Sequence, residues 1–302
     1  RSIKGQGSRG NNLSVYGATT ILITGATTSS QFGIRSYGNG ARSLKFSDID
    51  ICYRDNTFLG ALIVNLDSPG LKAERCYFGT YGITGATRLT APECILRTTY
   101  DEFINFVDCV FSGAQRGWHP DDATTIGGST FGGFGTKFDS CTFYDFTVNH
   151  FKTDGTRARQ GIKFLNCAFN PINEQPVRCI DAANVDELSL DSCQFVASTT
   201  IAPSTEWIRA NNSNGTIFNC EIGSLAKAGT FENLSNFTIN GCKIAGTFGW
   251  TLDSGTYTCG GNKWRNAGYA YQMVGSNYLS VQLNPDQFVS TVTTSYYVPT
   301  DN

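Results

Sequence analysis

A pattern of apolar and polar positions, eight residues long, recurs along the chain. Each copy has the form apolar-x-apolar-x-polar-Cys-x-aromatic or aliphatic, with departures at the two ends of the series. The copies are ILITGATT (21–28), LKFSDIDI (44–51), LKAERCYF (71–78), INFVDCVF (104–111), TKFDSCTF (136–143), IKFLNCAF (162–169), LSLDSCQF (188–195), GTIFNCEI (215–222), FTINGCKI (237–244) and YTCGGNKW (257–264). The apolar residues at positions one and three alternate with polar ones, which is typical of a short strand with one buried face.

The polar position before the cysteine predicts a bend. In five copies it is occupied by Asp108, Asn166, Ser192, Asn219 and Gly241. Asn, Asp and Gly tolerate left-handed backbone angles, so the chain is able to turn there at little cost. The cysteine and the aromatic or aliphatic residue after it then point inward again. Each window therefore predicts a strand, a bend and a second strand.

Successive windows lie 20 to 33 residues apart, measured between their sixth positions. A further short strand precedes most of them, for example LIVNL (62–66), CIDA (179–182) and WIRA (207–210). Constant windows separated by loops of changing length indicate a solenoid. We predict an all-β fold, a right-handed single-stranded parallel β-helix of about ten coils over residues 1–270, forming a rod of roughly 50 Å.

The window is absent from residues 271–302, where YLSVQL (278–283) and VSTVTTSYYVP (289–299) alternate apolar and polar residues. Because a solenoid needs its last coil covered, we expect residues 271–302 to be capping or trimerisation strands. A homotrimer is favoured over a monomer whose cap folds back on its own chain. The chain begins at Arg1 without a start methionine, and we expect an N-terminal part of a longer protein to be missing.

Composition argues against several classes of protein. The net charge is −2 and no stripe of Lys or Arg is visible, so we expect no nucleic-acid partner. No apolar stretch reaches about 18 residues, so we expect no membrane insertion. The chain has 11 cysteines and no CxxC pair, which argues against a complete disulfide framework or a zinc site. Seven of them occupy the window and predict a ladder of buried free thiols, with no metal or other cofactor.

This arrangement resembles the pectin-lyase-like superfamily and, within it, the central domain of bacteriophage tailspikes. The resemblance rests on the opening SIKGQG (2–7), which leads into the first window, and on the Asn/Asp–Cys–x–Phe windows through residue 264. Plant-type polygalacturonase signatures and the triplets GHG and RIK are absent, so we do not expect a pectinase. The resemblance implies a homotrimer attached to a phage tail through its missing N-terminal region, with a bacterial surface polysaccharide as its partner.

Reactive side chains on such a rod belong to the outward positions of the strand before each window. Alternation predicts one outward stripe on neighbouring coils, made of Asp154, Asp181, Arg209 and Glu232. Carboxylates one or two coils apart would be separated by about 5 or 10 Å, which brackets the geometries of glycoside hydrolysis. We therefore expect Asp154 and Asp181 to be the catalytic pair, with Glu232 and Asp121 in reserve.

The two longest coils contain the segment RGWHPDD (116–122), which combines an aromatic ring, an imidazole and two carboxylates. Such a loop suits glycan binding. Alternation also predicts that Trp207 and Trp250 point outward, into a glycan groove or a trimer contact. The expected substrate-binding residues are Trp118, His119, His150, Lys152, Trp207 and Arg209.

These features favour a tailspike that binds a bacterial capsule or O-antigen and depolymerises it by glycoside hydrolysis. A polysaccharide lyase is the enzymatic alternative, with Lys152 or His150 abstracting the proton beside a uronate carboxylate. A receptor-binding or purely structural β-helix is the non-enzymatic alternative, because fold alone does not decide function. Free buried thiols suit folding in a reducing cytoplasm, and we expect the protein then to be carried on the virion and to act at the bacterial surface.

Overall fold

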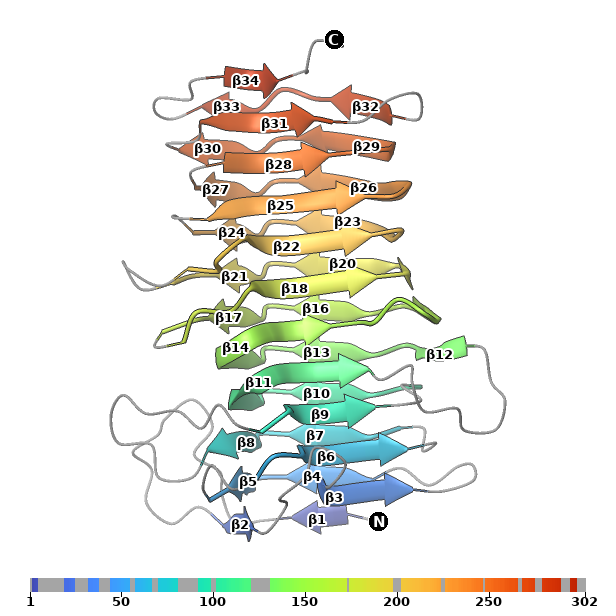
Figure 1. Cartoon of the computed structure of the whole chain (residues 1–302), viewed down its shortest axis with the longest axis vertical. Helices are drawn as coiled ribbons and strands as arrows, with labels where there is room; N and C mark the ends of the chain where they lie inside the picture. The colour runs from blue at the N-terminus through green and yellow to red at the C-terminus, as the bar shows by residue number, and fades with distance from the viewer. Residues whose placement is uncertain are drawn as a thin grey trace.

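The computed structural model shows a single rod of stacked coils, with the N-terminus at one end and the C-terminus at the other (Figure 1). It describes residues 2–4, 19–24, 32–37, 44–54, 58–66, 70–80, 92–98, 102–120, 131–172, 174–197, 202–223, 226–246, 248–265, 268–274, 279–288 and 294–297. Within these ranges all regular secondary structure is β-strand. Accordingly, the described part of the chain contains no helix of the length and apolarity that crossing a membrane requires.

The strands form three long faces, and in each face equivalent strands of successive coils pair in parallel. The first face is made of β1 (Ser2–Lys4), β4 (Lys45–Ser47), β7 (Lys72–Glu74), β10 (Asn105–Val107), β13 (Lys137–Asp139), β16 (Lys163–Leu165), β20 (Leu188–Asp191), β23 (Asn214–Phe218), β26 (Ser235–Asn240), β29 (Gly255–Gly260) and β32 (Leu279–Leu283). The second face contains β2 (Thr20–Ile23), β5 (Asp50–Tyr53), β8 (Tyr77–Thr80), β17 (Ala168–Asn170), β21 (Gln194–Phe195), β24 (Glu221–Ile222), β27 (Lys243–Ala245), β30 (Lys263–Arg265) and β33 (Gln287–Phe288).

The third face carries the strands that precede the windows. It contains β3 (Phe32–Tyr37), β6 (Ala61–Leu66), β9 (Cys94–Thr98), β18 (Arg178–Ala183), β22 (Glu206–Asn211), β25 (Lys227–Glu232), β28 (Phe248–Leu252), β31 (Tyr269–Met273) and β34 (Thr294–Tyr297). Two long strands, β11 (Val110–Pro120) and β14 (Thr142–Lys152), run through both the second and the third face. A small sheet of β12 (Phe131–Phe134), β15 (Ala158–Gln160) and β19 (Val185–Asp186) lies between the third face and the next strand of the first.

The coils wind in a right-handed sense. In Figure 1 the chain rises from N to C, the third-face strands run to the right in front, and the first-face strands return behind them. Right-handed crossovers are the rule for parallel strands, because the right-handed twist of the strands favours them. The predicted right-handed parallel β-helix is therefore confirmed.

The bend between the first and second faces lies at the polar position of the window. Asp108, Asn166, Ser192, Asn219 and Gly241 have φ angles of 50°, 52°, 54°, 51° and 69°, as the sequence predicts. Each bend is tied to the next coil by its backbone. The N–H of Asn166, for example, donates to the carbonyl of Asp191 at 2.9 Å. The polar residue is thus selected for a left-handed conformation that is repeated coil after coil.

The window cysteines form the predicted ladder inside the rod. All eleven cysteines of the chain are free and buried. The Cys141 thiol lies 3.4 Å from the carbonyl oxygen of Asp139 and 3.5 Å from that of Phe106. Burial raises the pKa of Cys141, and likewise of Cys167, well above 9.0. Cys141 and Cys167 are consequently unreactive packing groups.

Aromatic ladders fill the remainder of the core. Phe111, Phe143, Phe169 and Phe195 stack ring on ring along the axis, with centroids 4.7 to 5.1 Å apart and interplanar angles of 8° to 10°. A second stack runs from Phe106 through Phe138 to Phe164. Equivalent residues meet because the strands are in register, so one aromatic per window produces a continuous stack.

A polar cluster closes the upper end of the cysteine ladder. Asn262, which takes the cysteine position of the last window, accepts the Cys242 N–H at 2.9 Å and donates to the Tyr271 hydroxyl at 2.9 Å. The Asp286 carboxylate accepts hydrogen bonds from Tyr271 and Trp264, both at 2.7 Å. Strands β32, β33 and β34 continue the parallel pairing above it. The role of residues 271–302 as a cap or trimer contact stays a prediction.

We expect Asn166→Val to lower the free energy of unfolding by about 1–2 kcal/mol, because a β-branched residue is strained in the left-handed region. Asn166→Gly is the matched control, since glycine adopts this conformation without steric cost. The measurement is the shift in the urea midpoint followed by tryptophan fluorescence. Equal midpoints for the two variants would contradict the account of the bend.

Candidate functional site

Two outward rows of charged side chains run along the third face. In the first, Lys152, Asp181 and Arg209 are Cα partners on successive strands. In the second, Arg178, Glu206 and Lys227 are Cα partners in the same way. The buried residues between the rows hold the backbone against the core, so that neighbouring coils bring these charges together. With their contacts, the rows form a third-face charge network, which consists of Glu93, His119, Lys152, Asp154, Arg178, Asp181, Glu206, Arg209, Lys227 and Glu232.

One end of the network is built around His119. Its Nε2 lies 3.0 Å from Asp154 Oδ2, and its Nδ1 lies 3.8 Å from Glu93 Oε1. Lys152 Nζ lies 3.7 Å from the other oxygen of Asp154. Burial opposes the charged imidazole, but the two carboxylates outweigh it and raise the pKa of His119 above 6.5. The hydrogen bond with His119 in turn lowers the pKa of Asp154 below 3.8, so Asp154 is an ionised carboxylate with a fixed orientation.

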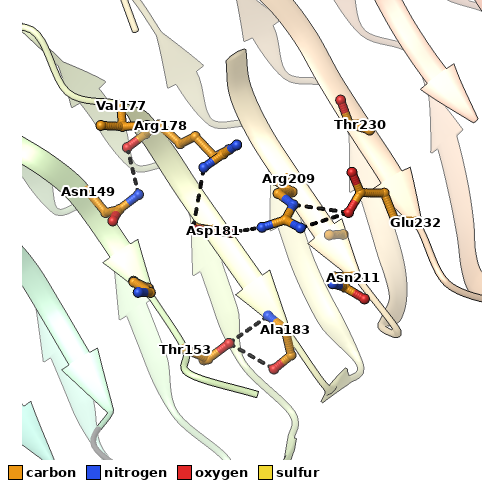
Figure 2. Close-up of polar contacts among 12 residues, drawn as sticks. Asn149, Thr153, Val177, Arg178, Asp181, Ala183, Arg209, Asn211, Thr230 and Glu232 are labelled. Atoms are coloured by element: carbon orange, nitrogen blue, oxygen red, sulfur yellow. Dashed lines mark hydrogen bonds and ion pairs between the residues drawn. The ribbon is translucent and has the colours of Figure 1, made fainter. Parts of the chain in front are cut away.

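Asp181 occupies a different environment one coil further on. Its side chain is 13% exposed, compared with 32% for Asp154. Arg178 Nη1 and Arg209 Nη1 lie 3.7 and 3.6 Å from its two oxygens, as Figure 2 shows. Burial raises the pKa of Asp181 above 3.8, although both guanidinium groups and Lys152 act in the opposite direction.

The two arginines are held by other carboxylates, which explains their incomplete effect on Asp181. Arg178 Nε donates to Glu206 Oε1 at 2.8 Å. Arg209 donates twice to Glu232 Oε2, at 3.1 and 2.8 Å (Figure 2). The short, directional hydrogen bonds therefore go to Glu206 and Glu232, and Asp181 receives only the longer contacts.

Glu206 anchors this part of the network from below the surface. It is 4% exposed and is contacted by Arg178, by Lys227 Nζ at 3.3 Å and by the Thr230 hydroxyl. Burial opposes its charge, but the bonds from Thr230 and Arg178 prevail and lower its pKa below 4.5. A buried carboxylate with three partners fixes the position of its neighbours.

Several residues expected from the sequence lie within this network. They are Asp154, Asp181, Glu232, His119, Lys152 and Arg209. Their catalytic and substrate-binding roles stay predictions. Asp121 lies outside the described residues. The part of the chain that the structure describes contains no group of three or more side chains suited to hold a metal ion.

The tryptophans expected on the surface are in the core, and that prediction is wrong. Trp118 and Trp207 are each 0% exposed, as is Trp250. Trp118 packs on Phe151 with ring centroids 4.8 Å apart, and its Nε1 donates to Thr98 Oγ1 at 3.0 Å. Residues 116–120 of that segment are not a loop but the end of β11, where alternation turns Trp118 inward and His119 outward. Trp118 and Trp207 are therefore unavailable to a glycan.

His150 is also buried, so its expected role as a sugar contact is wrong. It is 0% exposed and stacks against Phe169 with centroids 5.9 Å apart. Its neighbour Phe151 is buried as well, and so are the consecutive pairs Cys179–Ile180 and Trp207–Ile208. Each pair lies at the corner between the second and third faces, where two successive side chains point inward and strict alternation fails.

Sequence reasoning missed Arg178, Glu206, Glu93 and Lys227. A signal for two of them was present, because Arg178 and Glu206 each stand two residues before an inward isoleucine, Ile180 and Ile208. Aligning these strands pairs an arginine with a glutamate on neighbouring coils. Glu93 has no such signal, because the stretch before β9 lacks the repeat.

Comparisons with solved structures give low-identity likenesses in overall architecture. An alginate lyase from Paenibacillus sp. str. FPU-7 is 10% identical, with 85% of this chain and 92% of that chain covered and a TM-score of 0.38. The tailspike protein 2 enzymatically active domain of bacteriophage CBA120 is 10% identical, with 92% of this chain and 43% of that chain covered and a TM-score of 0.35. A mannuronan C-5 epimerase A-module, AlgE6, from Azotobacter vinelandii is 10% identical, with 100% of this chain and 89% of that chain covered and a TM-score of 0.34. No protein-family model and no curated protein matches the chain.

We predict that the two histidines titrate very differently. His119 should have a pKa above 6.5, and burial should hold the pKa of His150 at about 3. The measurement is an NMR titration of the imidazole resonances, with His119→Gln identifying the signal that moves near neutral pH. Because the pKa of His119 is raised, its ion pairs stabilise the fold below pH 6.5, and that contribution is lost as the pH rises through the pKa of the folded state. An imidazole of His150 that protonates near neutral pH would contradict the prediction.

Proposed function

We propose that this protein binds a bacterial surface polysaccharide along the third-face charge network and cleaves it by glycoside hydrolysis. The observation that carries the proposal is the opposite perturbation of Asp181 and Asp154. Burial raises the pKa of Asp181, while His119 lowers the pKa of Asp154. Two nearby carboxyl groups whose environments push their pKa values apart are what an acid and a base of one reaction require.

Asp181 is the proposed general acid. Its raised pKa favours the protonated form, which donates to the oxygen of the scissile bond. Arg178 and Arg209 hold it in place through contacts of 3.6 to 3.7 Å. As hydrolysis leaves the Asp181 carboxylate negatively charged, the same two guanidinium groups stabilise it.

Asp154 is the proposed general base. It lies two residues beyond Lys152, which is the Cα partner of Asp181 on the neighbouring coil. Strand geometry then gives a diagonal backbone separation of about 8 Å. In inverting enzymes the two carboxyl groups themselves lie roughly 6.5–9.5 Å apart, which is the separation that the proposal requires of these side chains. The His119 hydrogen bond aims the carboxylate at a water on the far side of the sugar. Lys152 and Arg209 are the proposed contacts to the sugar itself.

The proposed setting is a homotrimeric phage tailspike that is carried on the virion and acts at the bacterial surface. The sequence pattern supports it, through the (N/D)-C-x-F windows and the opening residues 2–7. The eleven free, buried thiols support folding in a reducing cytoplasm.

A lyase reaction is the second candidate, and one feature of the network favours it. Lys152 lies between the two carboxylates, close to a pair of arginines able to neutralise a uronate carboxylate. In that reaction Lys152 would remove the proton beside the carboxylate. His150, the other base expected from the sequence, is excluded by its burial. Hydrolysis releases reducing ends without an unsaturated product, whereas a lyase creates a double bond that absorbs in the ultraviolet.

The test uses purified capsular and O-antigen polysaccharides as probes, with reducing ends and ultraviolet absorbance measured together. On a polysaccharide that is cleaved, we expect Asp181→Asn and Asp154→Asn each to lower kcat by about 10²-fold or more, because each removes a proton-transfer group. The high-pH limb of the wild-type rate profile should report the raised pKa of Asp181.

Asp191→Asn is the matched control, a carboxylate-to-amide change on the first face, where the Asp191 carboxylate accepts a hydrogen bond from the neighbouring Ser192 hydroxyl. It should leave kcat at the wild-type value. Undiminished cleavage by the Asp154 and Asp181 variants would refute the assignment of the site. Binding without release of reducing ends on any probe would exclude hydrolysis, and ultraviolet absorbance would identify the lyase.

A further inference from the structure

Five residues share one position at the corner where the third face turns into the first, one in each of five consecutive coils. They are Gly70, Phe103, Gly135, Gly161 and Glu187, with φ angles of 79°, 52°, 76°, 69° and 60°. The N–H of each of the first four donates to a carbonyl of the next coil at 2.8 to 3.0 Å. This corner is a ladder of left-handed residues, whose side chains, where present, project away from the core.

Two ladder positions on successive coils, Gly135 and Gly161, are glycines, and the absence of their side chains leaves a groove. A Cβ atom on Gly135 would lie 3.4 Å from the Phe103 ring, and one on Gly161 would lie 3.9 Å from Glu187 Oε2. The side chains of Phe103 and Glu187 therefore bound the gap at its two ends. The resulting groove measures about 470 Å³ and is lined by Phe134, Gly135, Thr136, Lys137, Gln160, Gly161, Lys163 and Glu187.

The lower end of the groove presents an exposed aromatic pair. Phe103 and Phe134 are 52% and 44% exposed, and their rings meet edge to face with centroids 4.9 Å apart. A bulky residue in the left-handed region is uncommon and strained. The Phe103 N–H bond to the Phe134 carbonyl at 3.0 Å holds this conformation. The corner thus displays aromatic rings to solvent on a coil whose four partners in the ladder have glycine or glutamate at this position.

The wall of the groove on the first face is basic. Lys137 and Lys163 are Cα partners there, and two further lysines, Lys45 and Lys72, continue the same outward row with only Asn105 between them and Lys137. Lys137 is paired with Asp139 at 2.9 Å. Among the residues that the structure describes, no carboxylate lies within ion-pair distance of the Lys163 ammonium group.

We propose that this corner groove is a second saccharide-binding site, separate from the third-face charge network, and that it takes an acidic sugar. The apolar face of the ring packs on Phe134 and Phe103, and its carboxylate pairs with Lys163. Gln160 and Glu187 bind its hydroxyl groups. The proposal rests on the proposed function only in taking a polysaccharide as the ligand. Its consequence is that the polymer is held at two places on the rod, which raises its effective concentration at the cleavage site.

The experiment measures binding to the full chain by isothermal titration and NMR line broadening. The probes are hexasaccharides of hyaluronan, polygalacturonate and polysialic acid, with maltohexaose as the neutral comparison. We expect at least one acidic probe to bind the Asp154→Asn/Asp181→Asn double variant as tightly as it binds the wild type. Phe134→Ala and Lys163→Gln should each weaken that binding by roughly tenfold, because each removes one stacking or charge-assisted contact to the sugar. Both residues are on the surface, and Lys243→Gln on the second face is the matched control.

Binding that survives both groove variants would overturn the proposal, as would the absence of binding by all three acidic probes. Equal affinity for maltohexaose would overturn the role of Lys163. Failure of the proposed function has a different signature. In that case no polysaccharide is cleaved, while acidic hexasaccharides still bind and the groove variants still weaken them.

Discussion

Backbone hydrogen bonds between equivalent strands hold each coil on the one below it, and this in-register stacking determines where every side chain lies. The left-handed bend before each window cysteine keeps the register, because it returns the chain to the same angle in each coil. Once the coils are aligned, the window cysteines become a continuous ladder, and so do the phenylalanines at the ends of neighbouring windows. The core therefore has a repeating geometry, and in such a solenoid each coil depends mainly on its neighbours.

The same register organises the surface of the third face. Charged residues at equivalent outward positions meet at the spacing of the coils, and they meet as rows rather than as isolated pairs. Glu206 and Glu232 take the short hydrogen bonds of Arg178 and Arg209, which leaves Asp181 a partly buried carboxyl group with only longer contacts. An uneven distribution of partners within one network is thus what separates the pKa of Asp181 from that of Asp154.

Much of this arrangement was predictable from the printed sequence. The window cysteines and the left-handed residues before them were identified from composition and periodicity alone. Of the expected stripe, Asp181 and Arg209 are Cα partners, whereas Asp154 and Glu232 each lie two residues out of register with them. Two of the failures have one cause. Trp207 and His150 were assigned to the surface by strict alternation, but each precedes another buried residue at the corner between two faces. Corners break the period of two, and nothing in the local sequence marks the residue at which a strand turns the corner.

The sequence by itself determined the repeat, the inward ladders and the bends, because these depend on local preferences for backbone angle and on which side chains avoid water. Only the tertiary structure decided which residues share a row, because loops of different length precede each strand and hide its register. It also decided which carboxylate each arginine contacts. The groove at Gly135 and Gly161 was likewise decided by the tertiary structure, since two glycines on different coils form a groove only when the coils are stacked.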